Sequence, residues 1–300
     1  MPNEVNWPES IWKEINEAVV KEVAKVRIAQ KVFPTTAFDT DPTEVVNDVI
    51  VFPALTIKEG ATKPFVELYR EFPLTSAQVS KEAQSKACKT LARMTAKEIA
   101  LAEDTVIFQG TDGKLPGRVV AERVDSMVHG LLGEASPGDA NNDDPLKVTV
   151  PITVHKVPAE AKKPDGGRER GLIYGENTFS AVTEGIARLT SKGQAPNYAL
   201  ILPIKAYADT YVPPSPASLV TTAERIRPLV EGGFYGTGTL PPEKGLLVAL
   251  GGEPTSLYVG REATTEFVRK EGANYIFRVV ERVQFVARDP RAFVLLKFEQ

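Results

Sequence analysis

Few side chains of this sequence are suited to catalysis at neutral pH. The two histidines, His129 and His155, share no spacing, and the single cysteine, Cys88, has no base near it, which favours an inert thiol. The adjacent carboxylates Glu103 and Asp104 would serve a hydrolase only with a distant histidine. Neighbouring positions on a helix point about 100° apart, so the two carboxylates cannot face one substrate atom. Helix-end hydrogen bonding or an ion pair explains them better.

Other motifs of catalysis and ligand binding are missing from the sequence. It contains no Walker lysine loop, no H-E-x-x-H, no C-x-x-C pair and no G-x-S-x-G elbow. The glycines between Gly232 and Gly238 resemble a phosphate loop, but Pro241-Pro242 follows them in place of a lysine-bearing helix, which favours a turn. We therefore assign no catalytic residue, no metal ligand and no cofactor, and the motifs give little support to an enzyme.

Length and composition indicate a folded protein with few charged partners. The 300 residues are 42% hydrophobic and 25% charged, which excludes wholesale disorder, collagen and coiled-coil arrays. The 36 basic and 39 acidic residues leave a net charge of −3, so we expect neither nucleic acid nor membrane as a partner. One cysteine, no N-glycosylation sequon and no membrane-spanning or signal-like apolar run favour the cytoplasm.

The first part of the chain predicts a helix followed by a hairpin. Ser10 can cap the helix, which Phe33-Pro34 would end. Its apolar positions recur every four residues: Ile11, Ile15, Val19 and Val23. Two Val-rich runs, 45–52 and 65–68, are separated by residues 58–61 and predict a long hairpin. Two isolated strands bury too little surface to be stable alone, so this hairpin should lean on a neighbouring subunit.

The strongest helix pattern follows the hairpin. It opens near Thr75, runs as one element to about Phe108 and is ended by Gly110. About thirty residues would make a helix about 45 Å long, which suggests a structural spine. Residues 111–171 are the least regular part, with one alternating strand at 147–157 among charged loops.

The remainder of the chain predicts a mixed α/β unit that ends in strands. Helices are expected at 178–190, directly before Tyr211, and at 222–230, with strands at 198–202, 245–250, 257–259, 275–286 and 293–298.

Four stretches of the sequence match one family in order and in spacing. They are Trp12 with Glu14-Ile15 and Lys31-Val32, then Val66–Tyr69 with Phe72–Thr75, then Ala100–Asp104 with Ile107–Gly110, and last Asp289–Ala292 with Val294–Phe298. Together they resemble the encapsulin (linocin-like) family, bacterial and archaeal nanocompartment shell proteins with the tailed-phage major capsid fold. Residues 196–200 also resemble the start of that family's axial-domain strand. The turn at 29–32 and the longer segment 111–171 depart from the family pattern.

The resemblance implies an α+β protein with the Hong Kong phage type of major capsid fold. That fold has an N-terminal helix, an extended hairpin loop, a long spine helix, a peripheral domain and an axial α/β domain. The implied division is 1–35 for a lumen-facing helix, 36–72 for the extended loop, 73–115 with 255–300 for the peripheral domain, and 116–254 for the axial domain with the enlarged insertion 111–171.

The resemblance also implies a function without catalysis. The chain would assemble with itself into an icosahedral shell, a homo-oligomer in multiples of sixty, and enclose a cargo enzyme that carries a terminal targeting peptide. By motif position, cargo-docking candidates are Ile15, Val19, Val23, Val26, Tyr275 and Phe277. A rigid, nearly neutral fivefold pore would be lined by Pro213, Pro214, Ser215, Pro216 and Ala217. The alternatives are a viral or prophage major capsid protein that packages DNA and, from another class, a soluble hydrolase.

Overall fold

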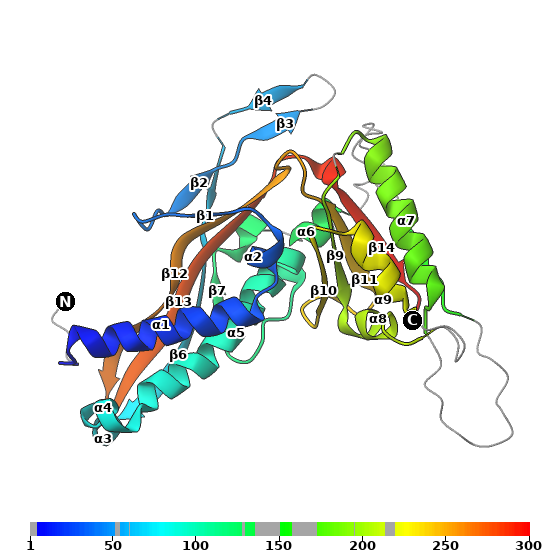
Figure 1. The fold of residues 1–300 in the computed structure, drawn as a ribbon. Helices are drawn as coiled ribbons and strands as arrows, with labels where there is room; N and C mark the ends of the chain where they lie inside the picture. The colour runs from blue at the N-terminus through cyan, green and yellow to red at the C-terminus, as the bar shows by residue number, and fades with distance from the viewer. Residues whose placement is uncertain are drawn as a thin grey trace, which may run out of the picture. The chain divides into compact units, whose positions relative to one another are not determined.

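The helices and strands of the computed structural model gather into two units, each built from separated parts of the chain (Figure 1). The structure describes residues 5–51, 55–59, 61–127, 130–135, 151–157, 173–194, 196–213 and 220–300. The first unit comprises Met1–Val49, Ile57–Gly130 and Ser256–Val286, and the second comprises Ile50–Thr56, Leu131–Thr255 and Ala287–Gln300.

The predicted N-terminal helix is confirmed as α1 (Glu9–Val26), which packs alongside α5 in the first unit (Figure 1). It begins after Pro8 with no side-chain cap, so Ser10 lies inside the helix and does not cap it. Extended backbone at Arg27 ends α1, and the short helix α2 (Ala29–Val32) follows. The helical segment expected as far as Phe33-Pro34 is therefore two helices joined by a bend.

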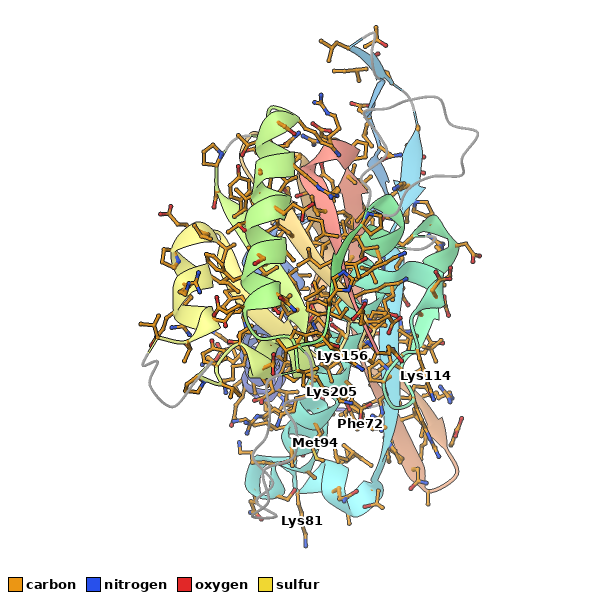
Figure 2. All side chains as sticks on the ribbon, turned by 90° about the vertical axis from the view of Figure 1, so that its right-hand side faces the viewer. Phe72, Lys81, Met94, Lys114, Lys156 and Lys205 are labelled. Atoms are coloured by element: carbon orange, nitrogen blue, oxygen red, sulfur yellow. The ribbon has the colours of Figure 1, made fainter. Side chains whose placement is uncertain are left out.

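The predicted spine is interrupted, which corrects the expectation of one continuous helix. It consists of α3 (Ser76–Ser80), α4 (Glu82–Ser85) and α5 (Ala87–Gln109). Lys86 has a left-handed φ of 51°, and the Glu82 carboxylate accepts hydrogen bonds from the main-chain N–H groups of Cys88 and Lys89. Glu82 thus starts α5 anew, leaving a helix of 23 residues, about 35 Å long. Lys81, at the corner between α3 and α4, points away from the protein (Figure 2).

A five-stranded sheet with the order β1-β12-β13-β6-β7 supports these helices. Its strands are β1 (Thr35–Ala37), β6 (Val66–Thr75), β7 (Val120–Glu122), β12 (Thr255–Glu271) and β13 (Asn274–Ala287). β13 and β6 are antiparallel, with Asn274 opposite Thr75 and Val283 opposite Val66. β12 is far longer than the strand expected at 257–259. The 3-10 turns η1 (Gly110–Asp112) and η2 (Val124–Met127) and the short helix α6 (Gly130–Glu134) follow α5.

A hairpin is present, but it reverses at a different place, and the run expected as its second arm, 65–68, instead leads into β6 of the five-stranded sheet. β2 (Glu44–Val46) pairs antiparallel with β5 (Thr62–Pro64), and β3 (Val49–Val51) pairs with β4 (Thr56–Lys58). The chain therefore turns back between β3 and β4, and the residues expected to form the turn, 58–61, lie on the returning arm. Lys58, Glu59 and Gly60 carry the usual composition of a turn, which misled the sequence reading.

The second unit contains another five-stranded sheet, with the order β10-β9-β11-β14-β8. The expected strands at 198–202, 245–250 and 293–298 are confirmed as β9 (Tyr198–Pro203), β11 (Lys244–Ala249) and β14 (Phe293–Phe298). Of the strand expected at 147–157, Ile152–Val154 forms β8, and residues 147–150 lie outside the described residues. β10 (Gly233–Thr237) runs parallel to β9, which corrects the interpretation of this glycine-rich segment as a turn. β14 pairs with β11 and β8, so the last strand belongs to this sheet.

Short helices cover the second sheet. The amphipathic helix α7 (Glu176–Ser191) packs on β8, β11 and β14, whereas α8 (Ile204–Asp209) packs on β9 and β10. α9 (Thr222–Ile226) continues into the 3-10 turns η3 (Arg227–Leu229), and η4 (Pro290–Ala292) precedes β14. Asp209 fixes the start of α7, because its carboxylate accepts hydrogen bonds from the main-chain N–H groups of residues 173–175.

Candidate functional site

The apolar face of α1 is buried within its own subunit. Ile15, Val19 and Val23, three of the expected docking residues, are fully buried where α1 packs against α5. Val26, one turn further along the helix, is only partly buried. The accessible surface of α1 therefore lies beside the buried stripe formed by Ile15, Val19 and Val23, not on it.

The beginning of α1 lies against an aromatic cluster on β6, β12 and β13. Phe277, fully buried, stacks with Trp7 at 5.3 Å between ring centroids and with Phe72 at 5.9 Å. Trp12 lies 5.1 Å from Trp7, whose indole N–H donates to the carbonyl of Val79. The structure thus brings Phe277, an expected docking residue, next to the N-terminal helix. It gives Phe277 a core role within the subunit.

Tyr275 lies at the border of this cluster and is only partly buried. Its ring is 6.1 Å from that of Phe267, and the ammonium group of Lys270 lies 5.1 Å above it. Tyr275 and Val26 are thus the two expected docking residues whose side chains keep accessible surface.

Between α1 and α5 runs a charged groove of about 240 Å³. Glu14 is held by Lys86 at 2.6 Å and by Lys89 at 2.8 Å, and Glu22 by Arg93 at 2.9 Å. The hydrogen bonds from Lys86 and Lys89 lower the pKa of Glu14 to about 2. Glu14 and Glu22 both lie in the segment that the sequence predicts as a helix, but the sequence pattern does not show which cations pair with them. This groove suits a polar peptide segment more than an apolar one.

Glu103 and Asp104 hold the junction between α1 and α2, as the structural interpretation predicted. The Asp104 carboxylate accepts hydrogen bonds from the main-chain N–H of Ile28 at 2.9 Å and of Ala29 at 2.8 Å. Glu103 accepts one from the Gln30 side chain at 2.8 Å. The two carboxylates bind different partners, and those partners belong to the bend between α1 and α2. This geometry does not favour the hydrolase alternative.

The remaining candidates for chemistry have structural surroundings. Burial raises the pKa of the Cys88 thiol above its usual range, so the thiol stays protonated and unreactive. His155 lies at the surface, 2.6 Å from the Glu299 carboxylate, and His129 lies outside the described residues. Across the ranges given above, no group of three metal-binding side chains is found. Nor does any described helix have the length and hydropathy to cross a membrane.

Of the expected pore residues, Pro213 is exposed and the other four, 214–217, lie outside the described residues. The flanks of this loop are joined by contacts that sequence reasoning missed. Arg227 donates to the Tyr211 hydroxyl at 2.9 Å, and the Tyr207 hydroxyl lies 2.8 Å from that of Tyr211. Tyr211 precedes the loop and Arg227 follows it, so these contacts fix both of its ends.

Comparison with solved structures places this fold. A virus-like particle from Pyrococcus furiosus shares it with a TM-score of 0.64 and 16% identity, over 96% of this chain and all of that one. The capsid of Myoviridae phage XM1 matches with a TM-score of 0.55 and 12% identity, over 91% of this chain and 92% of that one. The SrpI encapsulin complex from Synechococcus elongatus matches with a TM-score of 0.53 and 11% identity, over 99% of this chain and 91% of that one. The predicted α+β capsid-type fold is confirmed.

Sequence comparison identifies the family. A type 1 encapsulin shell protein, EncA of Myxococcus xanthus, is 27% identical over 119 residues, which is 40% of this chain and 41% of the length of that relative. The model of the family described as "Encapsulating protein for peroxidase" (Linocin_M18) matches residues 6–130 and 169–284. Since these two ranges make up most of the chain, this protein belongs to the encapsulin family.

Proposed function

We propose that this chain is the shell subunit of a cytoplasmic encapsulin nanocompartment. Copies of the chain assemble into an icosahedral homo-oligomer in multiples of sixty and enclose a cargo enzyme that carries a short targeting peptide. The family match over residues 6–130 and 169–284 carries the proposal. The family description names peroxidase as the enclosed protein, so a peroxidase is the first cargo to test.

The hairpin supports self-assembly. Val46, Leu55 and Ile57 lie on its strands or between them and are 58%, 73% and 61% exposed. Large apolar side chains that extend from a subunit in this way are stabilised when a neighbouring copy covers them. In the shell, we expect the extended loop 36–72, which contains the hairpin, to contact a neighbouring subunit, and residues 1–35 to face the lumen. The unit around α5 would form the peripheral domain, and the second unit would form the axial domain.

The structure refines the proposed docking of the cargo peptide. Ile15, Val19, Val23 and Phe277 form the buried framework, so the peptide meets the expected docking residues that keep accessible surface, Val26 and Tyr275. An aspartate at position 23 would bury an unpaired charge between α1 and α5 and damage the subunit itself. An aspartate at position 26 changes the accessible surface only.

Val26→Asp is therefore the test of docking. We expect shells of normal size that lose most of the co-purified cargo, measured as the cargo-to-shell ratio on a gel. Val20→Asp, at an exposed valine on another face of the same helix, is the matched control and should leave loading unchanged. Full loading in the Val26 variant would remove this surface from consideration.

We also propose that residues Pro213–Ala217 line a nearly neutral pore, since this segment carries no charged residue. Ser215→Asp should then raise cation flux through intact shells and lower anion flux, whereas Ser215→Ala should change neither. Equal ion fluxes in the two variants would show that the segment is an ordinary surface loop.

A phage or prophage capsid protein is the second candidate, because the XM1 capsid shares the fold over 91% of this chain. Negative-stain microscopy of the void peak from size exclusion, with gel and nucleic-acid analysis, separates the two. Uniform shells that contain a second protein and no nucleic acid support the encapsulin proposal. Shells filled with DNA support the capsid, and a small soluble species argues against both.

A further inference from the structure

The junction between α1 and α2 contains more buried acid than base. The guanidinium of Arg27 lies 3.1 Å from Glu281 of β13, 3.6 Å from Glu103 of α5 and 3.7 Å from Glu262 of β12. The side chains of Glu103 and Glu281 are fully buried, and that of Glu262 is 43% exposed. One buried cation thus faces two buried carboxyl groups and a third near the surface.

Three carboxyl oxygen atoms at this junction lack a hydrogen-bond donor, and one of them is Oε2 of Glu262. Oε1 of Glu281 accepts from Arg27 and Oε1 of Glu103 accepts from Gln30, but Oε2 of each carboxyl group is buried without a donor. The two carboxyl groups flank the same nitrogen of Arg27, Nη1, which lies 3.1 Å from Glu281 and 3.6 Å from Glu103. Two carboxyl groups so placed can hydrogen-bond to each other only when one of them carries a proton.

From this geometry we propose that the junction is a proton-operated latch, which holds α1 and α2 on the subunit while Glu103 and Glu281 share a proton and releases them when that proton is lost. The other charged groups here are Asp104 of α5 and Lys31 of α2, together with Glu262 and Arg27. Losing the proton leaves two buried negative charges beside the single guanidinium. Their repulsion opposes the docked position of Arg27.

The latch acts on α1 because Arg27 ends that helix. The next two residues, Ile28 and Ala29, are held by the Asp104 carboxylate, so the whole bend between α1 and α2 depends on this acidic cluster. Movement of Arg27 away from Glu281 therefore pulls on both helices at once.

The direction of the pH response follows from the environment. Burial first, and then the neighbouring Glu103, raise the pKa of Glu281; burial likewise raises the pKa of Glu103. Burial and Glu103 raise the pKa of Asp104 to about 8. The docked state binds more protons than the released state, so its stabilisation is complete at acidic pH and is lost as the pH rises through these raised values.

The chain contains its own reporter for this test. Its two tryptophans, Trp7 and Trp12, both lie at the start of α1 and contact Phe277. Tryptophan emission of the full-length protein therefore reports the docking of α1, and far-UV circular dichroism reports global unfolding. Limited trypsin digestion after Lys21, Lys25 and Arg27 gives a second measure of release.

We expect the wild-type emission to shift to longer wavelength on the alkaline side of neutrality, before ellipticity is lost, with faster trypsin cleavage in α1. In Glu281→Gln, the amide oxygen accepts from Arg27 and the amide N–H donates to Glu103, which mimics the shared proton permanently. That variant should stay docked at least about one pH unit higher. Glu103→Gln makes the same hydrogen bond from the other side and should behave alike.

Glu17→Gln is the matched control. It also removes one negative charge from α1, but at an exposed position outside the buried acidic cluster, so the midpoint should not move. The proposal is overturned if both glutamine variants titrate like the wild type, if emission and ellipticity change together, or if both variants fail to fold. The assay needs neither cargo nor shell, so its outcome is independent of the proposed function.

Discussion

Replacing Phe277 by alanine provides a quantitative test of how the N-terminal segment is attached. Phe277 is fully buried and stacks between Trp7 and Phe72. Removing a buried phenylalanine costs about 3–5 kcal/mol, because transfer energy is lost and a cavity remains. Each of its two stacked ring pairs contributes about 0.5–1.5 kcal/mol in addition to the burial of apolar surface, and most of this contribution is already included in the range of about 3–5 kcal/mol. We therefore expect Phe277→Ala to lower the free energy of unfolding by about 4 kcal/mol.

Guanidinium chloride unfolding, followed by tryptophan emission, measures this loss directly, because Trp7 is one of the stacking partners. Tyr275→Ala is the comparison, since Tyr275 lies two residues away on β13 but is only partly buried; its loss should be about 1 kcal/mol. If Phe277→Ala loses less than about 1 kcal/mol, or no more than Tyr275→Ala, then Phe277 is not the core residue described here.

Three further changes test separate features. Thr75→Ala should lower stability by about 1 kcal/mol in thermal unfolding, because the Thr75 side chain accepts from the N–H of Gln78 in a capping box; Thr75→Ser should retain it. Gly130→Ala should cost more than Gly252→Ala: both glycines have positive φ, but a Cβ at 130 would lie 2.6 Å from main-chain atoms at the end of α5, whereas at 252 the space is open. Equal losses would contradict this. Glu14→Gln should make the melting temperature depend less on pH in the acid range. The lowered pKa of Glu14 gives stability that is present above about pH 4.5 and is lost as the pH falls toward about 2, and the variant lacks this contribution; an unchanged slope would exclude this ion pair.

The sequence predicted those elements whose periodicity is strong. α7 and β9 were expected within a few residues, and so was the start of α1, because apolar side chains repeat every three to four residues in the helices and without interruption in the buried strand. The family resemblance supplied the fold, and the family match confirms both it and the expectation of a protein that is not an enzyme. These patterns concern one element at a time.

What the sequence did not predict depends on partners far along the chain. The break at Lys86 follows from Glu82 capping α5, and the bend after α1 follows from Asp104, which is 76 residues from Ile28. The strand β10 was misread because its glycines suggest a turn until its parallel partner β9 is known. The local preference of a residue for helix, strand or turn does not show which distant residue will become its partner.

The candidate site was predictable in position but not in detail. Apolar spacing identified Val19 and Val23, but spacing alone does not distinguish a face that docks a partner from one that packs on α5. Trp7 was missed because it precedes the helix pattern, although an aromatic residue just before a helix is a usable signal. The proposed docking of cargo at Val26 and Tyr275 stays a prediction.

The order in which the ribosome makes this chain has a consequence for its folding. Arg27 pairs with Glu281, which is synthesised 254 residues later. At about 5–20 residues per second, α1 leaves the ribosome roughly 13–50 s before β13 exists to receive it. During that interval the apolar stripe of α1 can pack on α5, but Arg27 has no Glu281 to pair with, and the second sheet still lacks β14, the strand between β11 and β8. Both sheets therefore become complete only when the last strands of the chain, β13 and β14, have been made.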